Sequence, residues 1–234
     1  MPFQLAGVIA SAALVAAPLF LQVSGAETEP SERAAEPIED VITVPTARVG
    51  LTPLEREEIV AQASAALGDV RTARGRFLQT APDWSQTTGD FALRRPGRVR
   101  FEYDAPTPIR IVADGATVAI EDRDLETQDR APLGATPLAL ILDDDIDFER
   151  EAEILDVERT DAYAAMTIQD RSGEVDGQLT LFFSRDGYDL LGWRTVDGAG
   201  GVTLVELSDV ETGVRINPRT FRIEDPEDSD DRRR

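Results

Sequence analysis

Residues 89–106, GDFALRRPGRVRFEYDAP, alternate apolar and charged side chains on either side of a turn sequence. Alternation of this kind is typical of β-strands with one buried and one solvated face. Pro96 and Gly97 favour a tight turn that joins two strands into a hairpin. Arg94 and Arg95 then lie at the end of the first strand. The apolar face of the hairpin carries Phe91, Leu93, Val99, Phe101 and Tyr103.

The same alternation recurs along the chain and predicts about eleven short strands in all. Turn sequences such as Asp114-Gly115 separate them, which favours antiparallel neighbours. Many short strands joined by tight turns curl into a barrel or a strongly bent sheet. The strands are expected at residues 74–80, 86–94, 98–103, 109–113, 116–121, 126–130, 151–159, 163–170, 178–184, 190–196 and 202–210.

Two helices are expected beside these strands. Residues 52–55, TPLE, combine an N-cap threonine, a proline and a capping-box glutamate, and an apolar stripe continues to Gly68. Residues 136–142, TPLALIL, repeat the cap and proline signal and predict a shorter helix. The apolar side of this helix carries Leu138, Ile141 and Leu142. Both helices need an apolar surface to cover, so we expect a mainly β fold whose concave side is lidded by helices.

Composition excludes several classes of function. Of the 234 residues, 45 are acidic and 24 basic, which gives a net charge of −21. This charge argues against a nucleic-acid partner and favours a self-repelling monomer. Cysteine, histidine and lysine are absent, which excludes thiol nucleophiles, disulfides, the usual zinc sites, serine–histidine pairs and Schiff bases. No cofactor signature is present, so we expect no cofactor. An enzyme would have to work with carboxylates or tyrosine, and no recognisable pair of acids is present, so we expect no enzyme.

The termini differ in composition from the centre. Residues 1–26 have no charged side chain, and their apolar run ends in small residues, which predicts a cleaved signal peptide. A retained membrane anchor is the alternative, because the run is close to the length that spans a bilayer. Residues 27–50 are expected to form a flexible acidic linker, residues 51–223 a single domain, and residues 224–234 a disordered acidic tail that ends in arginines.

An acidic run at residues 143–149, DDDIDFE, offers candidate ligands for calcium or a pair of glycosidase carboxylates. The run lacks the central glycine and the terminal glutamate of a calcium loop. Runs of like charge are usually solvated, so a solvated helix end is the preferred interpretation.

The apolar positions of the predicted sheet have two interpretations. They can form an ordinary solid core, which is the usual role of such residues. A large sheet bent around few helices can also enclose more apolar surface than the helices fill, which leaves a cavity. On the second interpretation the cavity is lined by Phe91, Leu93, Val99, Phe101, Tyr103, Ile109, Ile111, Leu138, Ile141 and Leu142.

Several short motifs, in this order and spacing, resemble the LolA family of periplasmic outer-membrane lipoprotein carriers. They follow an N-terminal helix and are Arg76-Phe77-Leu78-Gln79, Gly89-Asp90-Phe91, Arg95-Pro96, Pro106, Asp114-Gly115 and Thr136-Pro137-Leu138. The resemblance covers residues 54–210 and implies an unclosed barrel lidded by helices, whose apolar interior holds lipoprotein acyl chains. It further implies a periplasmic carrier that receives acylated lipoproteins from an inner-membrane ABC transporter and delivers them to an outer-membrane acceptor or to the outer membrane itself.

The resemblance also places at Arg95 the arginine that ties the lid shut. A buried guanidinium needs acceptors for its five donors, and the carbonyls at the end of a lid helix are the expected ones. A solvated arginine at a strand end is the alternative. Two other functions remain open. One is a related amphiphile carrier or envelope-stress sensor; the other is a carboxylate-based glycan hydrolase, against which the absence of a recognisable acid pair counts.

Overall fold

In a computed structural model, which describes residues 50–171 and 176–224, the chain forms one eleven-stranded antiparallel sheet. The predicted strand number is confirmed, and each predicted boundary lies within two residues of the observed one. The strands are β1 (Thr72–Thr80), β2 (Gln86–Arg94), β3 (Arg98–Tyr103), β4 (Ile109–Asp114), β5 (Thr117–Asp122), β6 (Thr127–Pro132), β7 (Ala152–Arg159), β8 (Tyr163–Asp170), β9 (Gln178–Ser184), β10 (Leu190–Val196) and β11 (Val202–Thr212).

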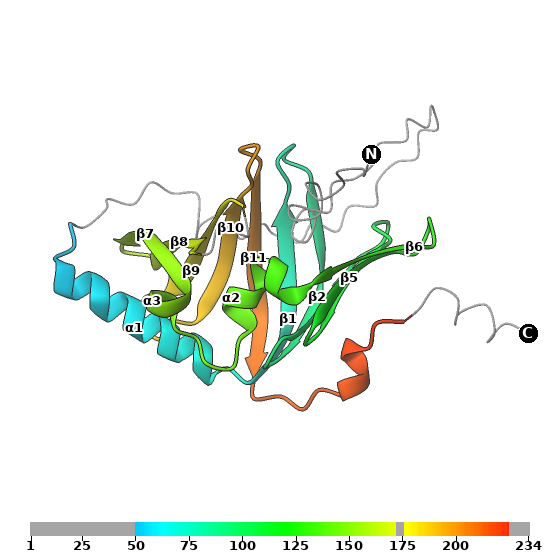
Figure 1. Ribbon diagram of the computed structural model, residues 1–234, viewed down its shortest axis with the longest axis horizontal. Helices are drawn as coiled ribbons and strands as arrows, with labels where there is room; N and C mark the ends of the chain where they lie inside the picture. Colours follow the sequence, from blue (N-terminus) through cyan, green and yellow to red (C-terminus); the bar gives the residue numbers. More distant parts are fainter. Residues whose placement is uncertain (1–49, 172–175, 225–234) are drawn as a thin grey trace, which may run out of the picture.

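The sheet is strongly bent but does not close. Its order is β6-β5-β4-β3-β2-β1-β11-β10-β9-β8-β7, so β6 and β7 are its two edges. Pairing of β1 with β11 joins two halves in which neighbours in sequence are neighbours in the sheet. Register shifts in the β1–β11, β9–β10 and β7–β8 pairs mark bulges, which bend strands. Figure 1 shows the resulting curved sheet with its helices on one side.

The helix α1 (Pro53–Asp69) begins with the predicted capping box. The Thr52 hydroxyl accepts the Glu55 backbone N–H at 3.3 Å, and the Glu55 carboxylate accepts the Thr52 backbone N–H at 2.7 Å. The helix α1 lies along the sheet (Figure 1). Its buried residues are Ile59, Val60, Ala63 and Leu67.

Residues 133–151 connect the two edge strands, β6 and β7, and therefore cross the open side of the sheet. This connection contains the 3₁₀ turn η1 (Leu133–Ala135), the predicted short helix α2 (Leu138–Leu142) and a further helix, α3 (Phe148–Glu151). Together with α1, it forms the lid on the concave side (Figure 1). We use the word lid for α1 and residues 133–151.

One local expectation about the lid is wrong, and another is incomplete, because exposed Asp143 does follow the last residue of α2. The Thr136 hydroxyl donates to the Leu133 carbonyl at 2.7 Å, so it closes η1, and α2 has no side-chain cap. The acidic run does not simply end a helix, because the Asp147 carboxylate accepts the Arg150 backbone N–H at 3.0 Å and starts α3. A helix of four residues is too short to produce a periodic sequence signal.

Residues 213–224, which we call the C-terminal strap, follow β11 onto the outer face of the sheet. They contain the 3₁₀ turn η2 (Pro218–Phe221), which packs against β3 and β4. Phe221 is buried, and so are Val112 and Ala119, whose positions alternate with the inward-facing residues of β4 and β5. The strap therefore covers apolar residues that the interior does not reach, and the strand pattern alone does not predict it.

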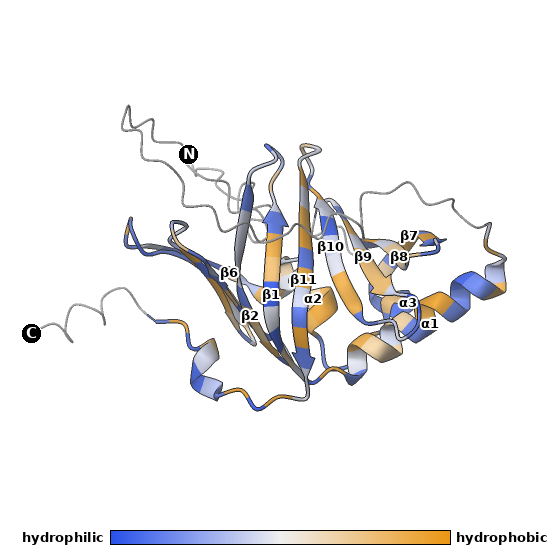
Figure 2. Ribbon diagram, turned by 180° about the vertical axis from the view of Figure 1, so that it is seen from behind, coloured by the Kyte–Doolittle hydropathy of each residue, from blue (hydrophilic) through white to orange (hydrophobic). Residues whose placement is uncertain are grey.

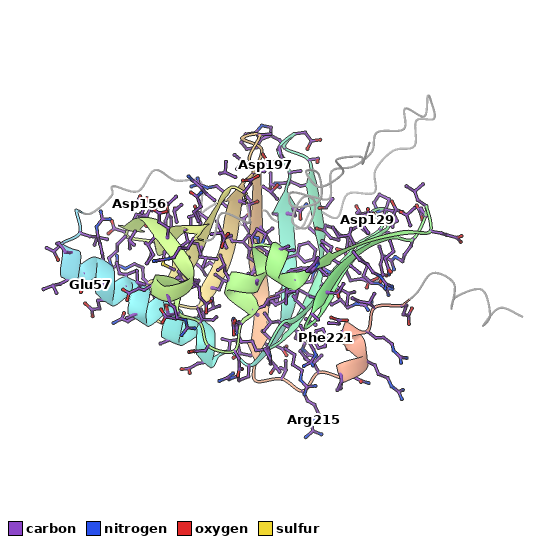
Figure 3. All side chains as sticks on the ribbon, viewed as in Figure 1. Glu57, Asp129, Asp156, Asp197, Arg215 and Phe221 are labelled. Carbon is purple, nitrogen blue, oxygen red and sulfur yellow. The ribbon has the colours of Figure 1, made fainter. Side chains whose placement is uncertain are left out.

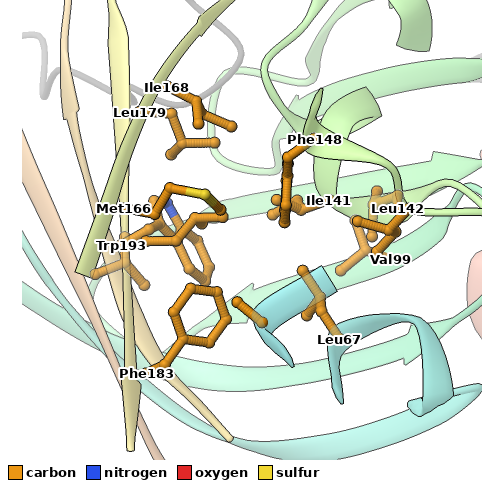
Figure 4. Packing of buried hydrophobic residues seen from close by; sticks show 14 of the residues in the cluster. Leu67, Val99, Ile141, Leu142, Phe148, Met166, Ile168, Leu179, Phe183 and Trp193 are labelled. Carbon is orange, nitrogen blue, oxygen red and sulfur yellow. The ribbon is translucent and has the colours of Figure 1, made fainter. Parts of the chain in front are cut away.

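The main core lies between the concave face and the lid. Figure 4 shows side chains from the helices and from both halves of the sheet pointing towards one another, among them Leu67, Ile141, Phe148, Phe183 and Trp193. Seen from behind, β1 and β11 alternate between hydrophobic and hydrophilic residues (Figure 2). The alternation that identified the strands thus also assigns each side chain to a face.

The predicted signal peptide, linker and acidic tail lie in residues 1–49 and 225–234, outside the described residues, apart from their boundary residues Gly50 and Glu224. Among the helices that the structure describes, none combines the length and hydropathy needed to cross a bilayer.

Candidate functional site

The concave face carries a cluster of aromatic side chains from several strands. The Phe77 ring packs edge-to-face against Phe101, with centroids 5.3 Å apart, and against Tyr103, at 5.0 Å. Phe101 also lies 6.3 Å from Phe91 and 6.0 Å from Trp193, which belongs to the other half of the sheet. Such tilted and edge-to-face pairs fill space with apolar surface. The cluster therefore forms a continuous apolar floor beneath the lid.

The predicted cavity residues come together on this floor and on the lid above it. Most of them are buried, namely Phe91, Val99, Phe101, Tyr103, Ile111, Ile141 and Leu142. Leu93 and Ile109 are half-buried and pack against the same cluster. Leu138 lies in α2, but its side chain is outside the described residues. These residues form the interface between sheet and lid, and their contact with acyl chains stays a prediction.

Several interior residues are missing from the predicted set, and three of them are large side chains from other elements. Trp193 and Met166 come from the second half of the sheet, and Phe148 comes from α3; all three are buried. Strand alternation carries the signal for Trp193 and Met166, because both occupy inward positions of predicted strands. Phe148 had no such signal, since its helix is shorter than two turns.

Few polar groups enter this interior. The Tyr103 hydroxyl donates to Gln79 Oε1 at 2.7 Å, and burial raises the pKa of Tyr103 although this hydrogen bond opposes the shift. Tyr103 therefore stays neutral. The Trp193 indole N–H is buried and has no hydrogen-bond partner among the described residues. An interior with so few polar groups offers few hydrogen bonds to water and a large apolar surface to hydrocarbon.

Arg95, at the end of the β2 region, is 6% exposed, so the alternative of a solvated arginine is wrong. Its Nε donates to the carbonyl of Val70, the C-cap of α1, at 2.9 Å. Its Nη1 donates to the carbonyls of Ile141 and Asp143 at the end of α2, the second at 3.0 Å. One guanidinium thus joins the C-terminal ends of two lid helices to the sheet.

The backbone around Arg95 strengthens this junction. The Arg95 N–H donates to the Arg71 carbonyl at 2.9 Å, and the Gly97 N–H donates to the Leu142 carbonyl at 2.8 Å. Gly97 has φ +71°, and an added Cβ would lie 2.8 Å from the Cα of Gly115, so only glycine fits this turn without strain. The β2–β3 turn therefore forms hydrogen bonds to the end of α2 through both a side chain and the backbone.

The electrostatics of Arg95 combine a favourable position with an unfavourable environment. Unpaired carbonyls and the macrodipole make a helix C-terminus partly negative, and here two such ends face one cation. Burial lowers the pKa of Arg95 to about 10, and the nearby cation of Arg71 adds to this effect. Arg95 remains charged at neutral pH. Its Nη2 is buried without a hydrogen-bond partner among the described residues, so the guanidinium is incompletely satisfied.

A groove of about 760 Å³ lies on the opposite, outer face of β8–β11. Tyr163 and Phe182 line this groove with ring centroids 5.4 Å apart, and Trp84, which is 84% exposed, lines it too. Phe182 alternates with the inward-facing Leu181 and Phe183 along β9, which places the groove outside the main core. The predicted cavity residues do not line this groove.

The acidic run of residues 143–149 does not assemble a metal site. Asp147 caps α3, and Asp144 forms an exposed ion pair with Arg71. Within residues 50–171 and 176–224, no three carboxylates gather in a metal-binding arrangement.

The chain is similar in sequence to known proteins. Residues 68–224 match the family model described as outer membrane lipoprotein carrier protein LolA. The outer-membrane lipoprotein carrier protein of Halorhodospira halophila is 34% identical over 171 residues, which are 69% of this chain and 79% of that protein. The protein of the same name from Alkalilimnicola ehrlichii is 28% identical over 193 residues, which are 78% of this chain and 88% of that protein.

Among solved structures, a LolA superfamily protein from Nitrosomonas europaea has a TM-score of 0.42 and 11% sequence identity, over 72% of this chain and 97% of that chain. The family assignment rests on the sequence matches, since the family model covers more than half of the chain. The chain belongs to the LolA family of outer-membrane lipoprotein carrier proteins.

Proposed function

We propose that this protein is a periplasmic carrier that holds the acyl chains of lipoproteins between the concave face of its sheet and its lid. The observation that carries the proposal is the junction at Arg95, which closes two lid helices over an apolar floor through hydrogen bonds to carbonyls alone. Bonds of this kind can break when a ligand enters, because water can satisfy the carbonyls of an opened lid. Burial of each methylene group offsets this loss by about 0.8 kcal/mol.

The same junction supports release of the cargo. A closed lid packs its own residues, such as Ile141, Leu142 and Phe148, onto the floor that cargo would occupy. Each charge-assisted hydrogen bond favours closure by about 1.5–3 kcal/mol, so closure competes with retention of the acyl chains. Arg95 is therefore proposed as the latch of the lid, and Phe91, Val99, Phe101 and Ile111 as part of the acyl-chain cavity.

The transport route is part of the proposal. The protein would receive cargo from an inner-membrane ABC transporter and pass it to an outer-membrane acceptor or to the outer membrane itself. Residues 1–26 would direct export, and residues 51–223 would act as the carrier domain, most simply as a monomer because a net charge of −21 disfavours self-association. The names of the relatives from Halorhodospira halophila and Alkalilimnicola ehrlichii support the lipoprotein cargo.

The test is binding of a purified triacylated lipoprotein to the chain that begins at Glu27, measured by co-elution in detergent-free buffer. Wild type is expected to bind. Phe101→Glu places a charge in the centre of the floor and should reduce binding more than tenfold. Val202→Glu, at an exposed position of β11, is the matched control and should bind normally.

Thermal unfolding of both variants separates loss of binding from loss of the fold. Equal binding by Phe101→Glu and wild type would contradict an interior site. Mass spectrometry of lipid that co-purifies with the periplasmic protein tests the alternative of a related amphiphile carrier. A bound lipid without an attached lipoprotein would favour that alternative, and turnover of cell-wall glycans would contradict a carrier without enzymatic activity.

A further inference from the structure

The C-terminal strap and the neighbouring ends of β2 and β3 gather arginines that lack acidic partners. The chain has 45 acidic side chains and 24 basic ones, so an arginine without a carboxylate nearby is unexpected. Within residues 50–171 and 176–224, five arginines at this end of the molecule form no ion pair. We call them the arginine patch: Arg94, Arg98, Arg215, Arg219 and Arg222.

The backbone pairing places these residues on one end of the outer face. Arg94 lies directly opposite Arg98 in the β2–β3 ladder, although like charges in such positions repel. Thr72 pairs with Arg94 on its other side, and the Thr72 carbonyl accepts the N–H of Gly213, where the strap begins. Arg215 follows two residues later, and Figure 3 shows its side chain projecting away from the molecule.

The rest of the strap is held against the same strands. The Arg100 guanidinium donates to the Thr220 carbonyl at 3.4 Å, and the following residue, Phe221, is buried. Arg219 and Arg222 flank this anchored turn and are both exposed. With Pro218 and Glu224 they line a hollow of about 480 Å³. The strap therefore presents its cations from a supported surface with a concave site.

The nearest carboxylates are occupied elsewhere. Glu211 pairs with Arg74 at 2.7 Å, and the Asp114 carboxylate accepts two backbone N–H groups of its turn, each at 2.9 Å. Glu224 lines the hollow, but its carboxylate lies 3.9 Å from Arg110. Arg98 itself donates only to the Asp114 carbonyl, at 3.2 Å. Among the described residues, no carboxylate therefore forms an ion pair with the arginine patch.

We propose that the arginine patch is a membrane-surface site that binds the phosphate groups of anionic lipids. A guanidinium matches phosphate with two parallel hydrogen bonds, and the hollow between Arg219 and Arg222 has room for a head group. Protein interfaces usually place Trp, Tyr or Phe at their centre, whereas the one aromatic residue of the strap, Phe221, is buried. This composition favours lipid over an acidic protein as the partner.

The patch lies on the outer face, apart from the lid and the floor, so its binding does not depend on acyl cargo. It would orient the carrier at a membrane while the lid remains on the other face of the sheet. The overall charge of −21 repels an anionic surface, but at an ionic strength of about 0.1 M this repulsion is screened beyond roughly 10 Å. The charges at the contact surface then determine whether the protein binds an anionic membrane.

The test is partition of the chain that begins at Glu27 onto vesicles of phosphatidylglycerol and phosphatidylcholine, measured by sedimentation at about 0.1 M salt. The full C-terminus is kept, so the acidic residues 225–231 compete during the measurement. Each arginine near an anionic surface contributes about a fivefold gain in partition. Changing Arg215, Arg219 and Arg222 together to Gln should therefore lower partition on the order of a hundredfold.

The matched control changes three exposed arginines outside the arginine patch and the lid to Gln, namely Arg123, Arg185 and Arg194. Both triple variants lose the same charge, so equal loss of binding would assign the effect to net charge and overturn the proposal. Equal partition of wild type onto pure phosphatidylcholine would also overturn it, as would binding of polyglutamate without binding of vesicles. Uptake of an apolar fluorescent probe, measured in parallel, reports on the proposed carrier interior and should be unchanged in both variants.

Discussion

The Arg95 side chain donates hydrogen bonds to three carbonyls at the ends of two lid helices. Its removal should therefore alter transfer of lipoprotein more than the stability of the fold. Arg95→Leu removes the charge-assisted bonds to Val70 and Asp143, but it also removes a buried cation whose pKa is lowered to about 10 by its environment. The two effects oppose each other. We expect a melting temperature close to wild type, normal uptake of lipoprotein, and at least a tenfold loss of transfer to an acceptor.

Transfer of a labelled lipoprotein from the purified carrier measures this effect. Arg74→Leu, at an exposed position in β1, is the matched control and should transfer normally. Normal transfer by Arg95→Leu would remove the latch from the mechanism.

Asp104 supplies a second test at the level of one residue, in this case of stability and pH. Its carboxylate accepts hydrogen bonds from Arg76 and Thr88, and these interactions lower the pKa of Asp104 below 3.8, with Arg76 as the largest cause. A lowered pKa stabilises the fold above the unfolded-state value and loses this effect as pH falls through the folded-state value. Both side chains of the pair are more than one-third exposed, so screening limits the contribution.

We therefore expect Asp104→Asn to lower the free energy of unfolding by about 1 kcal/mol at pH 7. The difference from wild type should shrink as the pH falls from the unfolded-state value of 3.8 through the lower folded-state value, because the folded carboxylate is then protonated and loses the ion pair. Urea unfolding at pH 7 and pH 3 measures both values. Asp186→Asn, in an exposed turn, should show no such change, and a pH-independent difference at position 104 would exclude the ion pair as the cause.

At the level of elements, the aromatic floor depends on glycines that let strands and rings approach. A Cβ at Gly89 of β2 would lie 2.2 Å from the Glu102 carbonyl oxygen and 2.6 Å from the Phe77 ring. Gly89→Ala should therefore destabilise the protein by about 1–3 kcal/mol through overpacking. The measurement is the urea midpoint. Gly134→Ala, where a Cβ would have no neighbour within 4 Å, should change it little, and equal effects at both sites would refute the packing argument.

At the level of the whole molecule, excess negative charge should make stability depend on salt. The net charge of −21 on a compact chain causes self-repulsion, whereas most of its ion pairs are exposed and weak. Raising sodium chloride from about 0.01 M to 0.3 M shortens the Debye length and should raise the melting temperature by about 2–4 °C. A lower melting temperature would show that the ion pairs outweigh the repulsion. Differential scanning calorimetry at constant pH decides between them.

Sequence by itself determined the strands, the capped start of α1 and the faces of the sheet. These properties are local: alternation assigns each side chain of a strand to one face, and a capping box involves residues three positions apart. The strand Gln86–Arg94 and the apolar positions Phe91 and Phe101 follow from such short-range rules. The helix α3 and the C-terminal strap have no local period, so the sequence alone did not predict them.

Only the tertiary structure decided what Arg95 contacts. In the sequence it is a strand-end arginine beside Arg94, and the two cannot be told apart by local pattern. The sheet order makes β6 and β7 opposite edges, so residues 133–151 must cross the open side and bring the end of α2 to the β2–β3 turn. Arg95 is buried between helix ends, whereas Arg94 lies opposite Arg98 on the outer face. The physical reason is that contacts between residues 25 to 48 positions apart depend on how the sheet bends and how the lid crosses it, which no local period encodes.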